Sequence, residues 1–482
     1  MLRRTKIVAT IGPATDTYAH LEKLLLAGVN VVRLNFSHGE ISDHQRRVAT
    51  IRKICAEHQL HIAIMGDLQG PKIRIAQFSD GKVQLIAGQS FILDTQLAQS
   101  SGDKNRVGID YPQLIDDCAV GDELLLDDGR VTMQVTDKSS TSLTCKVLTG
   151  GLLSNNKGIN KKGGGLSASA LTAKDKRDIN SAVELDLDYL AVSFPRSAED
   201  MQTARQLVKE AGGECRLVAK IERAEAVAND QILDAIICAS DVVMVARGDL
   251  GVEIGDAALI AVQKKIISRA RKLNRVVITA TQMMESMVDS PLPTRAEVFD
   301  VANAVLDGTD AVMLSAETAA GHYPVETVEA MARIIIGAEQ DSSTQTSSHR
   351  LNRCFLAVDE TMAMCAMYAA NHMPAIKAII CLTESGNTTL LMSRISSGIP
   401  IIALTSHPKT TRRVAMYRGV HAIPFDSGAT LNAEVNQRAV SQLLNKQLVV
   451  EGDLVIITKG DYVDAQGGTN TLKLIKVSSN IQ

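Results

Sequence analysis

Eight short runs rich in valine, isoleucine and alanine, separated by amphipathic segments, constrain the fold of residues 1–340 most strongly. Near-continuous apolar strands that alternate with helices are typical of parallel β-α units. Eight such strands are the number that closes a (β/α)8 barrel, the TIM-barrel form of the α/β class. An open, doubly wound sheet is the alternative, but no strand-to-helix turn in residues 1–340 carries the Gly-x-Gly-x-x-Gly pattern of that fold. The predicted strands are Thr5–Thr10, Val31–Phe36, Ile62–Leu68, Tyr189–Phe194, Leu217–Ile221, Val242–Ala246, Val276–Thr281 and Ala311–Ser315.

A long insertion interrupts this pattern after the third predicted strand, where about a hundred residues precede the helical segment Thr172–Leu185. Its apolar and polar residues alternate, and Asp80-Gly81 and Asp128-Gly129 predict hairpin turns. We therefore predict a small all-β domain at 70–169, inserted in a barrel formed by 1–69 and 170–341. Because the loop after a strand opens at the C-terminal face of a barrel, this domain would overhang the active site as a lid.

The Ser/Thr-rich run Asp341–Ser348 predicts a linker, and helices and strands alternate again beyond it. This pattern predicts a separate, open α/β domain at 349–482. Its predicted helices are Glu360–Met373, Leu390–Ser397, Thr410–Arg418 and Asn432–Lys446, and its predicted strands are Ala375–Leu382, Pro400–Leu404, Val420–Phe425 and Asp453–Thr458.

Composition and charge exclude several classes of partner. Lys and Arg total 51 against 54 Asp and Glu, and the net charge of −3 argues against a broad surface for nucleic acid or an anionic membrane. No apolar run approaches the ~18 residues that span a bilayer, and no secretory signal precedes the first strand. Eight scattered cysteines without a Cys-x-x-Cys pair fit neither a disulfide scaffold nor a zinc site. We expect a soluble, cytoplasmic protein.

Six of the predicted strands end in polar or charged residues, and the C-terminal ends of barrel strands meet at one face. Any one of these groups is equally explained by a solvated salt bridge or a turn. Their coincidence on one face favours a catalytic site. The residues concerned are Arg33, Asn35, Ser37, His38, Asp67, Lys220, Glu222, Arg247, Gly248, Asp249, Thr281, Gln282, Ser315 and Glu317.

The residue types at this face suit phosphoryl or enolate chemistry. Glu222 and Asp249 are hard oxygen ligands of the kind that Mg²⁺ prefers, and Arg33 and Lys220 supply positive charge without a metal. The sequence shows no Walker A motif, no protein-kinase Gly-rich loop and no Ser–His–Asp arrangement. The basic, glycine-rich run 154–165 is either an ordinary surface loop or a phosphate clamp carried on the lid.

An ordered set of motifs resembles the pyruvate kinase family, and the resemblance runs from Thr5 to the C-terminus with the same three-domain layout. The motifs are Asn35-Phe-Ser-His-Gly, Asp67-Leu-Gln-Gly-Pro-Lys-Ile-Arg74, Lys220-Ile-Glu222, Met244-Val-Ala-Arg-Gly-Asp-Leu-Gly251, Thr281-Gln-Met-Met-Glu-Ser and Asp310-Ala-Val-Met-Leu-Ser-Ala-Glu-Thr318. The resemblance implies transfer of the phosphoryl group of phosphoenolpyruvate to ADP, which gives pyruvate and ATP in the last step of glycolysis. It also implies a homotetramer regulated allosterically through the C-terminal domain.

The resemblance implies a role for each residue at the barrel face. Phosphoenolpyruvate would place its phosphate against Arg33 and Lys220, and its carboxylate against Thr281 and the backbone at Gly248 and Asp249. Glu222 and Asp249 would hold Mg²⁺, or Mn²⁺ in its place. ADP would lie between barrel and lid near His38, Arg74 and Lys157, with a second Mg²⁺. Lys220 would stabilise the phosphoryl group and the enolate, and Thr281 and Ser315 are the family's candidates for the water relay that protonates the enolate.

Two positions depart from the members of the family that need K⁺. Those members hold the ion with residues that match Asn35, Ser37 and Asp67 and with a threonine, and they carry glutamate at a nearby position. This chain has Leu68 in place of the threonine and Lys72 in place of the glutamate. We predict that the Lys72 ammonium enters the cation pocket, held by Asp67, so that K⁺ is not required.

The run Thr383–Thr388, which follows the first strand of the C-terminal domain, matches the family's effector loop. Hydroxyls and backbone N–H groups of Thr383, Ser385, Gly386, Asn387 and Thr388 would bind a phosphate, whereas a plain helix start is the alternative. Members activated by fructose bisphosphate commonly carry a cation at or near the position of Glu384. The acidic residue disfavours a second phosphate, so we expect a sugar monophosphate or AMP as the effector.

Two other functions share part of this pattern. A Mg²⁺-dependent lyase or aldolase of 2-oxo acids also needs a charged barrel mouth, but it needs neither the lid nor the third domain. A non-catalytic sugar-phosphate sensor would be built around the C-terminal domain, and the intact Lys220, Glu222 and Asp249 argue against it.

Overall fold

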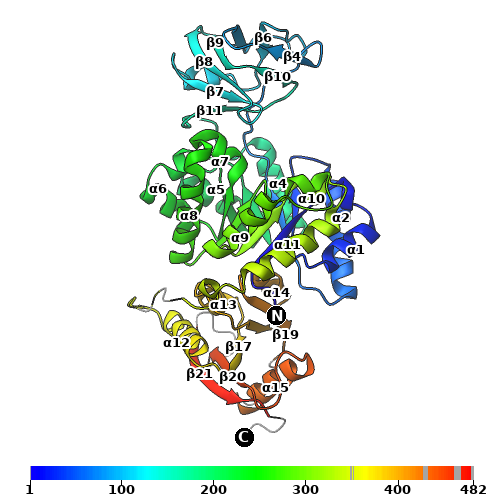
Figure 1. The fold of residues 1–482 in the computed structure, drawn as a ribbon, viewed down its shortest axis with the longest axis vertical. Helices are drawn as coiled ribbons and strands as arrows, with labels where there is room; N and C mark the ends of the chain where they lie inside the picture. The colour runs from blue at the N-terminus through cyan, green and yellow to red at the C-terminus, as the bar shows by residue number, and fades with distance from the viewer. Residues whose placement is uncertain (1, 348–349, 351, 427–431, 461–467, 479–482) are drawn as a thin grey trace.

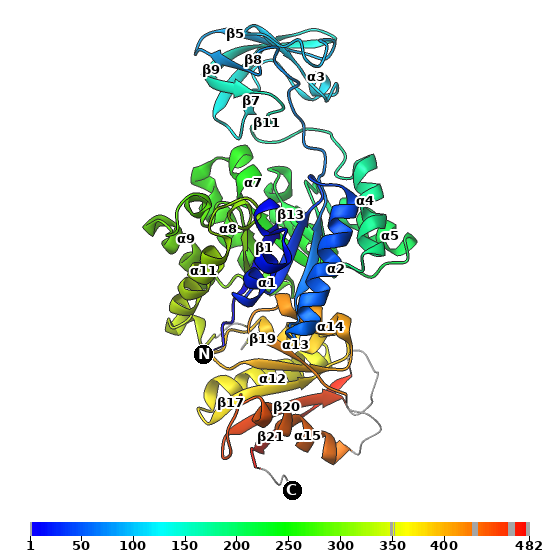
Figure 2. The same cartoon turned by 90° about the vertical axis from the view of Figure 1, so that its right-hand side faces the viewer.

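The chain folds into three parts stacked along one axis, with the β-rich lid at one end, the barrel in the middle and the C-terminal domain at the other end (Figures 1 and 2). The computed structural model describes residues 2–347, 350, 352–426, 432–460 and 468–478. The C-terminal ends of the barrel strands face the lid, and their N-terminal ends face the C-terminal domain. None of the described helices is both long enough and apolar enough to cross a membrane.

The eight predicted strands form a closed parallel barrel in the order β1-β16-β15-β14-β13-β12-β3-β2. Their bounds are β1 Lys6–Ile11, β2 Val31–Asn35, β3 Ala63–Asp67, β12 Tyr189–Val192, β13 Arg216–Ile221, β14 Val242–Ala246, β15 Val276–Ala280 and β16 Ala311–Leu314. The predicted bounds differ from these by at most two residues. The differences fall mainly where a strand passes into its catalytic loop.

Helices surround the barrel and begin at local sequence signals. Thr172 and Thr294 each accept a hydrogen bond from the backbone of the first helical turn, so that α4 and α9 start there. The bounds are η1 Pro13–Thr15, α1 Tyr18–Leu26, α2 Ile41–Glu57, α4 Ala173–Glu184, α5 Ala198–Glu210, η2 Glu225–Val227, α6 Asp230–Ala239, α7 Arg247–Ile254, α8 Asp256–Lys272, η3 Glu285–Val288, α9 Arg295–Asp307, α10 Ala316–Ala319 and α11 Pro324–Ala338.

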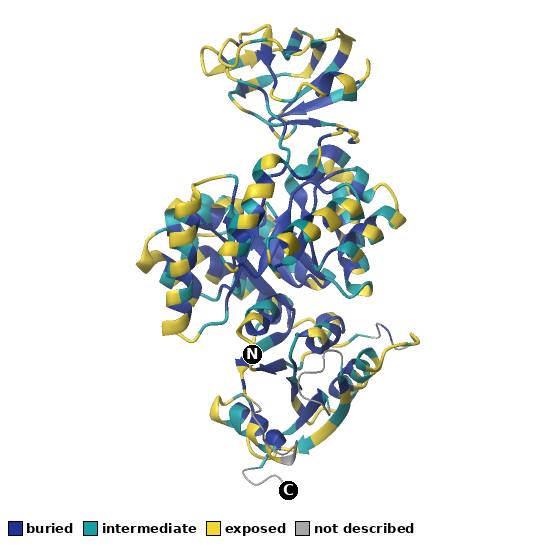
Figure 3. Ribbon diagram, turned by 180° about the vertical axis from the view of Figure 1, so that it is seen from behind, coloured by how far each residue is buried: buried dark blue, intermediate teal, exposed yellow. Residues whose placement is uncertain are grey.

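Apolar side chains of small and medium size fill the interior of the barrel, whose strands are buried (Figure 3). Alternate strand residues face inward, among them Val8, Ala63, Met65 and Met244. Residues in between, such as Ile7 and Val32, pack against the surrounding helices. The inward-facing cluster continues through Tyr189 and Tyr417 into the core of the C-terminal domain, so the two domains share apolar packing.

The insertion is a β domain whose main sheet has the order β11-β7-β8-β9-β5-β6, with β10 and β4 paired beside it. Asp128 and Gly129 lie in the hairpin that joins β7 to β8, as predicted. Asp80-Gly81 is not a hairpin, because it leads into β4, which pairs with the distant β10. The bounds are β4 Lys82–Leu85, β5 Ser90–Asp94, β6 Arg106–Gly108, α3 Leu114–Asp117, β7 Glu123–Leu126, β8 Val131–Lys138, β9 Ser142–Thr149, β10 Gly151–Ser154 and β11 Ile159–Lys161.

The C-terminal domain is an open sheet in the order β19-β18-β17-β20-β21. Its bounds are α12 Val358–His372, β17 Ile376–Leu382, α13 Asn387–Ser393, β18 Ile401–Thr405, α14 Pro408–Arg413, η5 Val414–Met416, β19 Val420–Pro424, α15 Asn432–Asn445, β20 Leu454–Gly460 and β21 Thr469–Lys476. The antiparallel edge strand β21 was not predicted. Residue 348 of the predicted linker lies outside the described residues, and the linker also contains a packed turn, η4 Ser342–Thr344.

Buried ion pairs fix the barrel to the C-terminal domain. Arg394 from the turn after α13 is fully buried and forms a two-pronged ion pair with Asp310, which precedes β16. Arg4, which lies beside the buried Glu339 of the barrel, donates to the Ser397 carbonyl oxygen of the C-terminal domain at 2.7 Å. Removing one partner of such a pair would leave an uncompensated buried charge, so these contacts define one interdomain arrangement.

Candidate functional site

A cavity of about 220 Å³ opens at the C-terminal ends of the barrel strands, beneath the lid. The strands β2, β3, β13, β14 and β16 contribute side chains to it, and the chain that leads into the lid contributes others. The lining residues are Arg33, Asn35, Ser37, His38, Asp67, Leu68, Gln69, Lys72, Arg74, Phe194, Lys220, Glu222, Met244, Ala246, Asp249, Thr281, Met313 and Ser315. Most of the predicted catalytic residues therefore meet in one place.

A chain of four charged side chains crosses the floor of this cavity. Arg33 Nε lies 2.6 Å from Asp67 Oδ2, and Lys220 Nζ lies 3.3 Å from Asp67 Oδ1. Lys220 Nζ also lies 2.9 Å from Glu222 Oε1 and donates to Ser193 Oγ at 2.7 Å. Asp67 and Glu222 are almost fully buried. The two cations and two carboxylates balance one another in a place where water does not screen them.

This chain of charges sets the protonation of its members. Burial opposes ionisation of Asp67, but the attraction of Lys220 and Arg33 outweighs it and holds the Asp67 pKa below its usual value. Burial alone would lower the pKa of Lys220, and the facing carboxylates raise it instead. Lys220 is therefore an ammonium at neutral pH and can stabilise negative charge on a substrate.

Glu222 and Asp249 fit a divalent cation. Burial raises the pKa of Glu222 to about 7, and repulsion by Asp249 adds to that rise. A cation placed between the two carboxylates would remove this repulsion. The described residues hold no cluster of three or more His, Cys, Asp and Glu side chains suited to a metal. Such an ion would therefore complete its shell with substrate and water oxygens, as Mg²⁺ commonly does.

Thr281 lies on a strained turn after β15. Thr281 and Gln282 have φ values of 67° and 52°, a left-handed conformation that is rare for residues other than glycine. Gly248 N donates to Thr281 Oγ1 at 2.8 Å, and Arg247 donates to the Thr281 carbonyl oxygen at 2.6 Å. The Arg247 side chain therefore supports this turn, and Thr281 itself and Ser315 reach the cavity.

The structure corrects the predicted partner of Lys72. Lys72 lines the cavity with Asn35 and Ser37, but its Nζ lies 3.5 Å from Asp249 Oδ1. Both Asp67 oxygens face Arg33 and Lys220 instead, so the prediction that Asp67 holds Lys72 was wrong. The Leu68 side chain is buried in the apolar core and offers no ligand.

The residues predicted for ADP divide into two groups. His38 and Arg74 line the cavity. Lys157 does not line it, because its Nζ lies 2.7 Å from Asp127 Oδ1 within the lid. Lys161 and Lys162 likewise pair with Asp122 and Glu123 of the lid, so the structure does not favour a phosphate clamp in this run.

The glycine-rich run is instead the point where the lid returns to the barrel. Gly163, Gly164 and Gly165 all have φ values between 80° and 92°, which glycine adopts without strain. Gly165 N donates to Glu225 Oε1 at 2.6 Å, and a Cβ on Gly164 would lie 2.5 Å from the same carboxylate. Any other residue at position 164 would strain the backbone at its φ of 80° and displace the Glu225 carboxylate.

Sequence reasoning missed a buried carboxylate, Glu253, that joins the lid to the barrel. Asn160 Nδ2 of β11 donates to Glu253 Oε1 at 3.3 Å, and Ala224 N, two residues after Glu222, donates to Oε2 at 2.8 Å. Glu253 lies in α7, the helix whose first turn carries Asp249. No local pattern marked it, because a glutamate late in a helix usually faces solvent. Ser193 was also missed, although its position just after β12 matched the other strand ends.

The predicted effector residues lie together at the start of α13. Gly386 N donates to Thr383 Oγ1 at 3.0 Å, and Asn387 Nδ2 donates to Asp359 Oδ2 at 2.9 Å. Thr388 Oγ1 lies 2.7 Å from Thr469 Oγ1 of β21. Glu384 forms an ion pair with His407. The strand-to-helix turn that the sequence predicted is therefore present.

The fold and the cavity define a TIM-barrel enzyme with a lid and a charged site for a small anionic substrate. Comparison with family models assigns residues 2–328 to the pyruvate kinase barrel domain and residues 360–475 to the pyruvate kinase alpha/beta domain. The chain is 58% identical to pyruvate kinase II of Salmonella typhimurium over 99% of both chains. It is 56% identical to a pyruvate kinase of Haemophilus influenzae over 98% of this chain and 97% of that one.

A crystal structure of a pyruvate kinase from Cryptosporidium parvum superimposes with a TM-score of 0.90 at 34% identity, covering 98% of this chain and 96% of that one. The chain belongs to the pyruvate kinase family. It is thus an enzyme that transfers a phosphoryl group between phosphoenolpyruvate and ADP, and the family requires a divalent metal ion. The lyase alternative and the non-catalytic sensor are not favoured, because the match extends over the whole chain.

Ionisation of the buried Glu253 should make the folded protein less stable as pH rises. Burial raises the Glu253 pKa from 4.5 to about 7, so folding favours the protonated acid. The stabilisation of the folded state by protonated Glu253 is fully present below pH 4.5 and is lost as pH rises through about 7. Glu253→Gln removes the ionisation. Between pH 5 and 8 its free energy of unfolding, measured with urea, should rise relative to wild type by about 2 to 3 kcal/mol.

Glu199→Gln, in the exposed first turn of α5, provides the matched control and should show no such trend. If the difference between Glu253→Gln and wild type stays constant from pH 5 to 8, Glu253 does not titrate in this range.

Proposed function

We propose that phosphoenolpyruvate binds with its phosphate against Arg33 and Lys220 and its carboxylate against Thr281, Gly248 and Asp249. The chain of charges from Arg33 through Asp67 and Lys220 to Glu222 carries this proposal, because it presents two cations at the same point of the cavity. In this arrangement the Lys220 ammonium would lie beside the phosphoryl group that is transferred. Positioning and electrostatic stabilisation then supply the catalysis.

Glu222 and Asp249 would hold Mg²⁺ or Mn²⁺, which would supply positive charge to the substrate oxygens when bound. His38 and Arg74 would contact ADP from the barrel and the lid. Lys157 would join them only through a rearrangement that releases it from Asp127. The oxygen–phosphorus bond of phosphoenolpyruvate breaks as a terminal oxygen of ADP attacks the phosphorus. Lys220 stabilises the enolate left behind, and a water held near Thr281 and Ser315 delivers the proton that completes pyruvate.

Lys220→Met tests the catalytic assignment. Methionine keeps a chain of similar length but removes the charge that faces the phosphoryl group, so an interaction made in the transition state is lost. We expect kcat to fall by several decades, with little change in the affinity for phosphoenolpyruvate, in a coupled assay of pyruvate formation. A variant that keeps more than a tenth of the wild-type kcat, about 1.4 kcal/mol of barrier, would remove Lys220 from this role.

Lys72 is proposed to replace a monovalent cation. Lys72 lines the same cavity as Asn35 and Ser37, where its ammonium lies 3.5 Å from Asp249 Oδ1, and Leu68 supplies no hydroxyl ligand. The wild-type enzyme should run at full rate in buffers that contain tetramethylammonium in place of K⁺, Na⁺ and NH₄⁺. Lys72→Glu should create K⁺ dependence, although a weak one because Leu68 is unchanged. The control variant Lys82→Glu, at an exposed position of the lid, should create no K⁺ dependence.

Activation of the wild-type enzyme tenfold or more by K⁺ would show that Lys72 does not substitute for the ion.

The effector is proposed to be a sugar monophosphate or AMP, bound by Thr383, Ser385, Gly386, Asn387 and Thr388. Glu384, which forms an ion pair with His407, adds negative charge beside this loop and disfavours a second phosphate. We expect a sugar monophosphate to lower the half-saturating phosphoenolpyruvate concentration, and fructose 1,6-bisphosphate to have little effect. Glu384→Lys should increase the response to the bisphosphate. Strong activation of wild type by micromolar bisphosphate would contradict this assignment.

A homotetramer is proposed from two exposed apolar patches on separate domains. One patch lies on α8, α9 and the loop before α9 and contains Ile260, Leu292 and Phe299. The other lies on α12 and β21, which pack together, and contains Val358, Tyr368 and Leu474. Two self-complementary patches of this kind would give a closed assembly with two sets of twofold interfaces. A cytoplasmic location also stays a prediction.

A further inference from the structure

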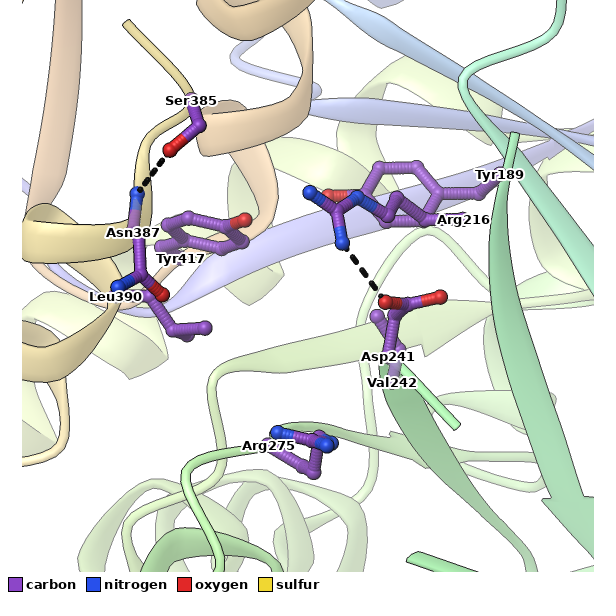
Figure 4. Close-up of a pocket in the computed structure, with 9 residues that line it drawn as sticks. All are labelled: Tyr189, Arg216, Asp241, Val242, Arg275, Ser385, Asn387, Leu390 and Tyr417. Atoms are coloured by element: carbon purple, nitrogen blue, oxygen red, sulfur yellow. Dashed lines mark hydrogen bonds and ion pairs between the residues drawn. The ribbon is translucent and has the colours of Figure 1, made fainter. Parts of the chain in front are cut away.

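A second polar cavity, of about 160 Å³, lies at the opposite end of the barrel from the catalytic cavity, against the C-terminal domain (Figure 4). The barrel side comes from residues at the starts of β12, β13, β14 and β15. The other side comes from the turn before α13, from α13 itself and from the segment after η5. The lining residues are Tyr189, Arg216, Asp241, Val242, Arg275, Ser385, Asn387, Leu390 and Tyr417.

Hydrogen-bond donors converge on this cavity from both domains. The Tyr417 side chain is 94% buried, and its hydroxyl points across the cavity toward Arg216 without a hydrogen-bond partner among the described residues. Arg216 donates one of its five N–H groups to Asp241 Oδ1, at 2.9 Å. Arg275 donates to the carbonyl oxygens of Ser240 (2.6 Å), Cys238 (3.0 Å), Asn274 (3.3 Å) and Leu273 (3.5 Å), which leaves one of its five N–H groups for a ligand.

The charges around the cavity leave an excess of positive charge. Asp241 is the one carboxylate in the lining, and it is shared between Arg216 at 2.9 Å and Arg205 at 3.0 Å. Arg275 has only carbonyl partners among the residues that the structure describes, and no carboxylate. The cavity lining therefore holds two guanidinium groups, Arg216 and Arg275, and one carboxylate, whose charge is also shared with Arg205 outside the lining. A half-buried, partly satisfied cluster of this sign favours a negatively charged occupant.

We propose that this interdomain cavity binds a small anion, the phosphate or carboxylate group of a metabolite, through Arg216, Arg275 and the Tyr417 hydroxyl. The cavity holds the volume of roughly five waters at about 30 Å³ each, which suits a single anionic group. The inference goes beyond the activity and the roles proposed above. It concerns a site separate from the backbone turn at Thr383, although Ser385 and Asn387 contribute to both.

The position of the cavity gives its occupant a route to the catalytic residues. Arg216 begins β13, and four residues later the same strand carries Lys220. Asp241 immediately precedes β14, which ends at Ala246 just before the helix that carries Asp249. An anion that joins these strand starts to Tyr417 and the turn before α13 would tie the C-terminal domain to the strands that carry the active site.

Phosphate is also expected to bind at Arg33 and at Thr383. The experiment therefore uses the full chain with the substitutions Arg33→Met and Thr383→Val, which weaken those two sites. Inorganic phosphate and, in a second series, malonate are titrated by isothermal calorimetry. We expect one site per chain to persist in this background. Adding Arg275→Met should weaken binding at least tenfold, and adding Tyr417→Phe should weaken it at least threefold. Tyr417→Phe preserves the packing and guards against misfolding of the arginine variant.

A preference for phosphate assigns the site to phosphate-bearing metabolites, and a preference for malonate assigns it to carboxylates. Crystals of wild type soaked in selenate should show an anomalous peak between Arg216 and Arg275. Absence of binding in the background protein, or binding that neither added substitution weakens, would overturn the proposal. A selenate peak without measurable binding in solution would be an adventitious ion only and would overturn it as well. Because the background lacks Arg33 and Thr383, the result does not depend on the roles proposed for those residues.

Discussion

Asp67 is the carboxylate on which the active site depends. It is almost fully buried at the end of β3 and faces Arg33 from β2 and Lys220 from β13. Burying any one of these charges alone would cost several kcal/mol, so each requires the others. The barrel makes this possible, because β2, β3, β12 and β13 are consecutive in the closed sheet and bring their ends to one face. The cations that would meet the substrate are thereby held in place before it binds.

The two outer domains contact opposite ends of the barrel strands and the loops that join them. The chain returns from the lid to the barrel at the glycine-rich run. There Glu225 accepts a hydrogen bond from Gly165, and Glu253 accepts hydrogen bonds from Asn160 and Ala224. Lys72, on the other connection to the lid, faces Asp249. At the opposite end, Asp310 and Arg394 join β16 to the C-terminal domain. Movement of either outer domain would therefore act on residues that precede or follow the catalytic strand ends.

Much of the fold and of the site composition could be predicted because the signals were periodic. Continuous apolar runs predicted the barrel strands, and the alternation of apolar and polar residues predicted the β structure of the lid. The polar residues at the strand ends predicted where the cavity lies. Contacts made between distant segments could not be predicted in this way. Which carboxylate Lys72 faces depends on how the lid connection lies over the barrel, and Lys157 finds Asp127 only once the lid has folded. The edge strand β21 carries many exposed polar residues, so it lacked the apolar run that marked its neighbours.

The activity of Asp67→Asn tests most directly the claim that this one carboxylate organises the site. Asparagine has nearly the same shape but carries no charge, so Arg33 and Lys220 would lose their shared counter-charge while the backbone is preserved. For a variant whose circular dichroism matches wild type, we predict that kcat/KM for phosphoenolpyruvate falls at least a hundredfold, about 2.7 kcal/mol, with the KM for ADP within threefold of wild type. A kcat/KM within threefold of wild type would contradict the central role of Asp67.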